Sequence, residues 1–128
     1  MLTIYEAFVT DFQSGGLIQS VRENEPAPSN NSGYAELQMG SIDKKPFTLG
    51  DSDLIEGDFR IVLRYPENSG VSNVREEIET HYKIGYSVGL GNNEKAVVSG
   101  FNMEIGEVKD EWYKLILNVR YRAIVKRG

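Results

Sequence analysis

The chain has 128 residues, of which 40% are hydrophobic, and its 14 basic and 19 acidic side chains give a net charge of −5. A chain of this length forms one domain that buries about two thirds of its unfolded surface, so residues 1–128 are expected to be a single domain. The absence of cysteine excludes disulfides and thiolate metal sites, and the acidic balance argues against wholesale nucleic-acid binding. Because the sequence has neither a leader-like N-terminus nor an apolar run of membrane-spanning length, we expect a soluble intracellular product.

The first half of the chain is expected to hold one helix and two short strands. Residues 3–13 combine a capping pair, Thr3 and Glu6, with apolar residues at helical spacing, which predicts an amphipathic helix. The segments predicted after it are a brief strand at 17–21, an extended exposed connection at 23–33, a strand at 34–39 and a polar loop at 40–53.

The second half is expected to contain the better-defined strands and a second helix. The predicted segments are a strand at 56–65, a helix at 72–84 with Gly85 as its end cap, a loose strand with a turn at 86–93, a strand at 96–108, a turn at 109–111 and a strand at 112–125. The fold class is therefore predicted as α+β, an antiparallel-dominated, mixed sheet of about four or five strands flanked by two helices.

The last predicted strand, residues 112–125, is the most informative segment. Its alternation places Tyr121 and other apolar residues on one face and Arg120 and Arg122 on the other. A strand of this length extends roughly 45 Å, which is more than a domain of this size needs to cover its own core. The excess length favours an assembling structural subunit over an enzyme.

Side chains that could carry chemistry are scarce. His81 is the single histidine and lies at the edge of a predicted helix stripe, without a recognisable triad context, so we expect a boundary residue and no catalytic residue. Asp51 and Asp53 flank a serine, but they lack calcium-loop spacing and indicate a solvated turn. We therefore expect no cofactor and no metal.

Neither the glycines nor the basic residues form a recognised phosphate-binding motif. The glycines between residues 85 and 91 do not form a phosphate-binding loop, because no Lys-Ser or Lys-Thr follows them. Arg120, Arg122 and Lys126 cluster near the C-terminal end, where they could meet an acidic neighbouring subunit, water or, less favourably, phosphate.

The order of several phrases gives the chain a resemblance to a known family. These phrases are an N-terminal helix, Glu25-Pro26-Ala27-Pro28 before Tyr34-Ala35-Glu36-Leu37, Phe47-Thr48-Leu49-Gly50-Asp51, the run from Glu56 to Pro66, a helix opening at Ser69-Gly70, and Trp112-Tyr113 leading a terminal strand that ends Arg120-Tyr121-Arg122-Ala123. In this order the chain resembles the tail terminator proteins of long-tailed bacteriophages, the lambda-like minor tail subunits of the neck. Its first helix is shorter, and residues 85–93 are looser, than in that family.

The resemblance implies a virion structural protein and no enzyme. It implies a closed ring of about six copies that caps the tail tube, ends tail polymerisation and offers a head-tail joining surface. The implied partners are further copies of the chain, the tail tube protein and a head-completion or connector protein, with DNA only in transit through the lumen and no membrane. The implied location is the neck of the virion tail, and the host cytoplasm during assembly.

The exposed loop predicted between Asp43 and Asp53 is the expected anchoring segment of such a ring. The candidate subunit or tube interface residues are Lys44, Lys45, Phe47, Leu49, Asp51, Asp53, Arg120 and Arg122. Phe47 could equally fold back onto its own core. Two alternatives stay open: another neck or head-tail connector subunit, and a small non-viral ligand-binding α+β domain or enzyme that uses His81.

Overall fold

A computed structural model describes residues 3–23, 25–27, 33–47, 50–66, 71–106 and 112–126. Its elements, in chain order, are α1 (Ile4–Ser14), β1 (Ser20–Arg22), β2 (Tyr34–Phe47), β3 (Ser52–Tyr65), α2 (Val71–His81), β4 (Ser87–Gly91), β5 (Glu94–Ile105) and β6 (Tyr113–Lys126). The predicted α+β class with two helices is confirmed for these residues, and the sheet has six strands instead of four or five.

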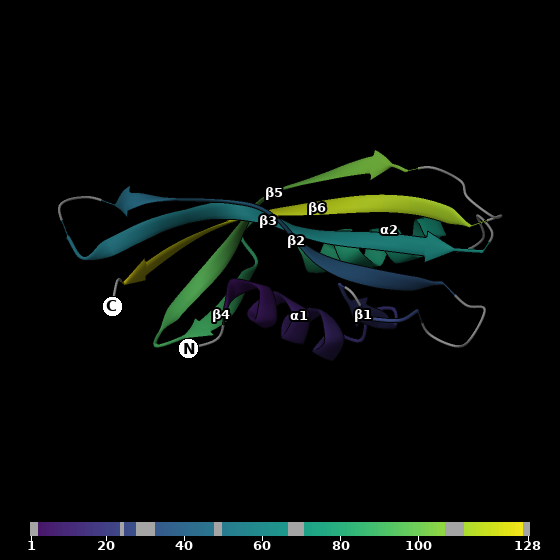
Figure 1. Cartoon of the computed structure of the whole chain (residues 1–128), viewed down its shortest axis with the longest axis horizontal. Helices are drawn as coiled ribbons and strands as arrows, with labels where there is room; N and C mark the ends of the chain where they lie inside the picture. Colours follow the sequence, from purple (N-terminus) through teal and green to yellow (C-terminus); the bar gives the residue numbers. More distant parts are fainter. Residues whose placement is uncertain are drawn as a thin grey trace.

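The six strands form one twisted sheet in the order β1-β2-β3-β6-β5-β4, shown in Figure 1. β1 and β2 are parallel, and every other neighbouring pair is antiparallel. β3 and β6 pair along their full lengths, from Ser52 opposite Lys126 to Tyr65 opposite Tyr113. These two strands are therefore the central pair of the sheet, and they continue to the left in Figure 1 beyond the part that the helices cover.

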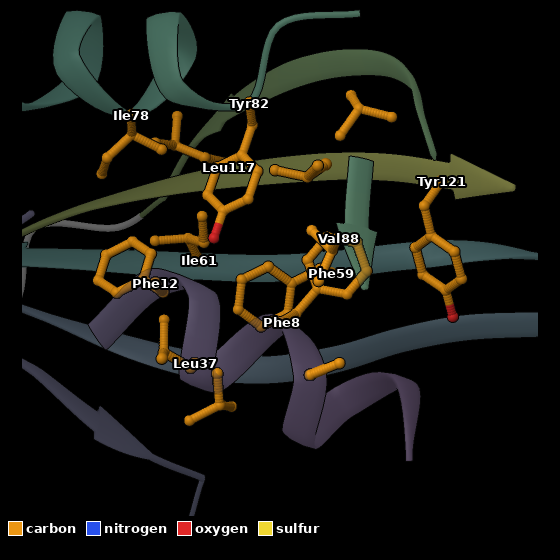
Figure 2. Close-up of a cluster of buried hydrophobic side chains, with 14 of the residues drawn as sticks. Phe8, Phe12, Leu37, Phe59, Ile61, Ile78, Tyr82, Val88, Leu117 and Tyr121 are labelled. Carbon is orange, nitrogen blue, oxygen red and sulfur yellow. The ribbon is translucent and has the colours of Figure 1, made fainter. Parts of the chain in front are cut away.

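Both helices lie on the same side of the sheet, which we call the helix-covered face; the opposite side is the open face. Phe8 of α1 stacks on Phe59 of β3 with ring centroids 5.0 Å apart, and it lies 5.2 Å from the ring of Tyr121 of β6. Ile78 and Tyr82, in and just after α2, complete this fully buried cluster (Figure 2). Each large apolar side chain buried here stabilises the fold by about 1.5–3 kcal/mol.

The ends of the helices follow the sequence signals in one case and depart from them in the other. The Thr3 hydroxyl oxygen accepts a hydrogen bond from the Glu6 N–H at 3.1 Å, which confirms the predicted cap of α1. α2 ends at His81, so the predicted end near residue 84 was wrong. Gly85 has φ 95° and donates its N–H to the carbonyl of Val98 at 2.8 Å, and it therefore joins the link after α2 to β5 and does not cap the helix.

The largest correction concerns residues 40–53, which were predicted to be a polar loop. β2 continues to Phe47, and β3 already starts at Ser52, so most of this segment is a β-hairpin. Residues 41–47 are exposed, which removes the two-residue alternation that reveals a half-buried strand. The backbone pairing of the two strands, which the sequence pattern does not display, holds the hairpin together.

The remaining strands are close to prediction. Residues 86–93 form β4 followed by a two-residue turn, in which Asn92 and Asn93 have φ of 54° and 62°, as a tight hairpin requires. β1 lies at Ser20–Arg22, slightly later than the brief strand expected at 17–21. The turn predicted at 109–111 lies outside the described residues, as does Leu49.

Candidate functional site

The β2–β3 hairpin extends beyond the core together with the end of β6, and we call its residues 40–47 and 52–57 the arm. β1 pairs only with Ala35–Leu37 of β2, so no described strand pairs with the outer edge of residues 40–47. A β-bulge between Met39 and Ile42 marks the point where the arm leaves the core. Unpaired backbone N–H and C=O groups on such an edge are a template for another strand.

Pro46 shows which backbone groups face outward from this edge. Pro46 is paired with Asp53 of β3, and proline has no N–H to donate to the ladder. The pair is therefore of the non-hydrogen-bonded kind, and the backbone groups of Pro46 point away from β3. By the alternation of the ladder, the N–H and C=O groups of Ile42 and Lys44 point outward as well.

A second unpaired edge lies on the opposite side of the sheet, along β5. β4 pairs only with residues 94–97 of β5, which leaves residues 100–105 without a described neighbour on that side. Gly106 donates its N–H to Lys114 of β6 at 2.8 Å, which fixes the alternation. The backbone groups of Phe101, Met103 and Ile105 consequently point away from β6.

Exposed apolar side chains accompany both edges. Ile42 on the arm is 55% exposed, and Met103 and Ile105 on β5 are 45% and 84% exposed. All three lie on the helix-covered face, because Ile42 is level with Gly57 and Tyr121, and Met103 is level with Leu117. Met103 and Ile105 also line an open groove of about 390 Å³ beside the start of α2.

The open face carries charges that are already paired within the chain. Glu56 contacts Lys45 at 3.6 Å and Arg122 at 3.3 Å, while Asp58 contacts Arg120 at 3.5 Å. Farther along the sheet, Arg60 and Glu104 form a looser pair at 4.0 Å. Such exposed pairs contribute little to stability, but they neutralise the arginines that were considered as phosphate contacts.

The structure separates the predicted interface residues into groups. Lys45, Arg120 and Arg122 belong to the paired charges of the open face. Lys44 contacts Asp53 at 3.6 Å. Asp53 is buried within β3, so the prediction that Asp53 lies in an exposed loop was wrong. Phe47 is 39% exposed at the end of β2 and is not part of the core cluster, and Asp51 is exposed.

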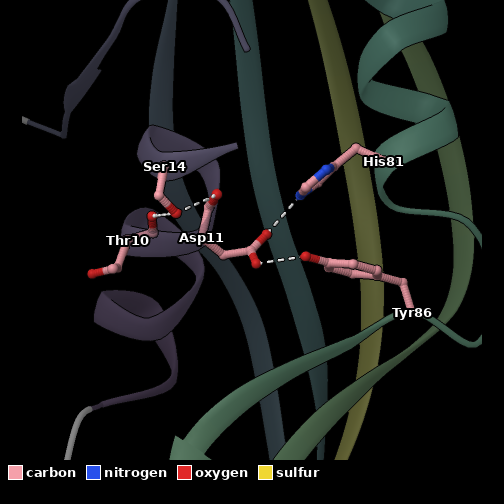
Figure 3. A network of polar contacts seen from close by, with 5 residues as sticks. All are labelled: Thr10, Asp11, Ser14, His81 and Tyr86. Atoms are coloured by element: carbon pink, nitrogen blue, oxygen red, sulfur yellow. Dashed lines mark hydrogen bonds and ion pairs between the residues drawn. The ribbon is translucent and has the colours of Figure 1, made fainter. Parts of the chain in front are cut away.

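A polar network that the sequence did not reveal joins α1 to the segment around α2. His81 Nε2 lies 2.8 Å from Asp11 Oδ2, and the Tyr86 hydroxyl donates to Asp11 Oδ1 at 2.7 Å (Figure 3). His81 is half-buried, as predicted for a boundary residue, and it has a carboxylate partner, Asp11, that its sequence context did not reveal. Asp11 precedes the buried Phe12 on α1, and only the packing of two helices 70 residues apart brings it to the imidazole.

The chemistry available to this network is limited. Burial and the bond to Asp11 raise the pKa of Tyr86 to about 12, so its hydroxyl stays protonated near neutral pH. Burial and, after it, the nearby carboxylate of Asp11 raise the pKa of Tyr82. An open groove of about 750 Å³ runs beside His81, lined by Gly15, Gly16, Thr80 and four other residues. The carboxylate of Asp11 contacts His81 and Tyr86, and these contacts tie α1 to the segment around α2.

Comparison with known proteins does not assign the chain to a family. No protein-family model matches the chain, and no curated protein matches it significantly. Among the described residues, no cluster of three or more His, Cys, Asp or Glu side chains could hold a metal ion. No helix in the described part of the chain has the length and apolar character needed to cross a membrane.

Proposed function

We propose that this chain is a structural subunit of the neck of a long-tailed bacteriophage, and that it forms a ring of about six copies that caps the tail tube. In this role it ends tail polymerisation and presents the surface on which the filled head docks. The observation that carries the proposal is the pair of unpaired sheet edges, one on the arm and one on β5.

Two further features support an assembling subunit. The arm carries few buried side chains, so it adds little to the core of its own chain while it exposes Ile42 and Phe47. Exposed apolar groups beside free edges are typical of surfaces that are covered on assembly.

The proposal is tested by capping. The chain is mixed with tubes polymerised from the tail tube protein of the same genome, and tube ends are examined by electron microscopy while native mass spectrometry gives the copy number. We expect ring-shaped density at one end of the tubes and an arrest of tube growth. Tubes that keep growing and bear no added density would contradict a terminator, and a ring that binds a head connector instead would indicate a sibling neck subunit.

A second candidate, a ligand-binding domain or enzyme that uses His81, is favoured by one observation: the Asp11–His81 contact lies beside an open groove. A thermal-shift screen with phosphate, nucleotides and sugars tests it. A stabilisation that His81→Gln abolishes and that Thr10→Ala, an exposed position outside the groove, retains would support this candidate. Normal capping by His81→Gln, with no stabilising compound, would leave the imidazole a structural role.

A further inference from the structure

We propose, building on the ring function above, that neighbouring copies join the arm edge of β2 to the free edge of β5 and so continue one antiparallel sheet around the ring. Each edge presents its backbone groups on every second residue: Ile42, Lys44 and Pro46 on β2, and Phe101, Met103 and Ile105 on β5. β2 and β5 run in opposite directions within one sheet. A rotation that keeps strand directions therefore makes the new pair antiparallel.

The lengths of the two free segments select one register. With Lys44 opposite Met103, Ile42 lies opposite Ile105 and Pro46 opposite Phe101, and neither β1 nor β4 obstructs the pairing. This register forms about five backbone hydrogen bonds between two copies, since only the missing N–H of Pro46 leaves one unmade. It also places the exposed Ile42 against the exposed Ile105, on the same face of the joined sheet.

The stagger between the two edges matches a closed barrel. Lys44 is level with Ile55 of β3, whereas Met103 is level, through Leu117, with Ile61. Ile61 lies six residues after Ile55. Each successive copy is therefore shifted by about 20 Å along the strand direction, while its four strands span about 19 Å across the sheet. The strands then tilt by about 45° from the ring axis, which is the upper end of the range for β-barrels.

The direction of the stagger decides which face lines the lumen. Figure 2 shows the helix-covered face, with β6 pointing right and β3 and β2 below it. With this face turned outward, the shift makes the strands wind right-handedly about the axis, as strand twist requires of a barrel. The open face, with its paired charges around Glu56 and Asp58, then lines a barrel that is about 50 Å across at the backbone for six copies.

Disulfide trapping tests the register directly, because the chain has no cysteine of its own. In the double variant Ile42→Cys, Ile105→Cys, the two thiols of one chain lie on opposite edges of a four-strand span, at least about 14 Å apart, and cannot bridge. Opposed residues of a hydrogen-bonded antiparallel pair have Cα atoms about 5.5 Å apart, within the range for a disulfide. We expect oxidation to give a ladder of covalent oligomers that ends at the ring.

The matched control is Ile42→Cys, Glu104→Cys, in which the second thiol lies one residue away and on the open face, so it should stay monomeric on a denaturing gel. A backbone test accompanies it: Met103→Pro removes one outward N–H and should abolish the oligomer, while Met103→Ala should keep it. Both variants are first checked for a native circular dichroism spectrum.

The possible outcomes separate the two proposals. A ring seen by native mass spectrometry without the 42–105 disulfide, or with equal cross-linking in the 104 control, would overturn edge pairing and leave the ring function standing. A chain that forms neither ring nor cross-link, alone or on tail tubes, would overturn both. A 42–105 ladder with a ring that survives Met103→Ala but not Met103→Pro is the result that the register requires.

Discussion

Gly57 lies where the arm leaves the core, and its replacement by alanine tests the geometry of that junction. A Cβ atom at this position would lie 2.6 Å from the carbonyl oxygen of Ser41 and 2.7 Å from the hydroxyl oxygen of Tyr121. Ser41 belongs to the bulge between Met39 and Ile42, and Tyr121 is buried. Gly57→Ala must therefore displace either the backbone of the bulge or a core ring.

The expected cost follows from these two contacts. Forcing an extra carbon into a packed site costs about 1–3 kcal/mol, so we expect Gly57→Ala to lower the free energy of unfolding by about 2 kcal/mol. For a domain of this size the melting temperature should fall by about 8 °C. Gly100→Ala is the matched control, because its Cβ would meet only the Arg120 side chain at 3.8 Å, an ordinary contact.

Urea unfolding followed by the fluorescence of Trp112, the single tryptophan, measures both variants. The double variant Gly57→Ala, Tyr121→Phe should regain part of the loss, since it removes the hydroxyl oxygen that the new Cβ meets. Gly57→Ala as stable as Gly100→Ala would refute the close packing of the bulge. The same variant should also weaken ring formation, because the bulge sets the direction of the arm.

Three further predictions concern the core, the polar network and the tyrosines. Phe8→Ala should lower the free energy of unfolding by about 3–5 kcal/mol, whereas Phe47→Ala, at an exposed site, should change it by less than about 1 kcal/mol. Equal losses in chemical denaturation would contradict the burial of Phe8 and the exposure of Phe47. A double-mutant cycle of Asp11→Asn and His81→Gln should give an interaction free energy of about 1 kcal/mol. An interaction free energy of zero would mean that the Asp11–His81 contact does not stabilise the fold. Burial, followed by the charge of Asp58, raises the pKa of Tyr121 from 10.0 to about 12. The contribution of Tyr121 to stability is therefore complete below pH 10 and is lost as the pH rises through 12. Ultraviolet titration of the native protein, compared with Tyr121→Phe, measures the pKa, and ionisation of Tyr121 near pH 10 would contradict the shift.

The parts of the fold that the sequence predicted are those in which side chains alternate between core and solvent. β6 is the clearest case, because Leu117, Val119 and Tyr121 are buried while Arg120 and Arg122 are exposed on the other face. The cap of α1 was also predictable, since it depends on two residues three positions apart. Local chemistry and two-residue periodicity were sufficient for these elements.

The arm and the Asp11–His81–Tyr86 network were not predictable in the same way. Residues 41–47 are exposed on both faces, so the strand is held by backbone pairing and by surface ion pairs of Lys44 and Lys45, and its sequence was predicted to be a polar loop. Asp11 meets His81 only because two helices pack on the same sheet face. Interactions that depend on three-dimensional placement leave no periodic signal in a single sequence.

The residues that disguise the arm as a loop also limit how it can assemble. An unpaired edge of this length invites uncontrolled pairing, and lysine and proline are the residues that natural edge strands use to prevent it. Pro46 removes one N–H, so a partner strand makes its hydrogen bonds mainly through Ile42 and Lys44. Lys44, paired with the buried Asp53, keeps a charge beside those groups. Pairing of two arms would bring their lysines together, whereas the β5 edge offers Met103 and Ile105. This asymmetry favours a heterologous contact, which is the kind that a ring requires.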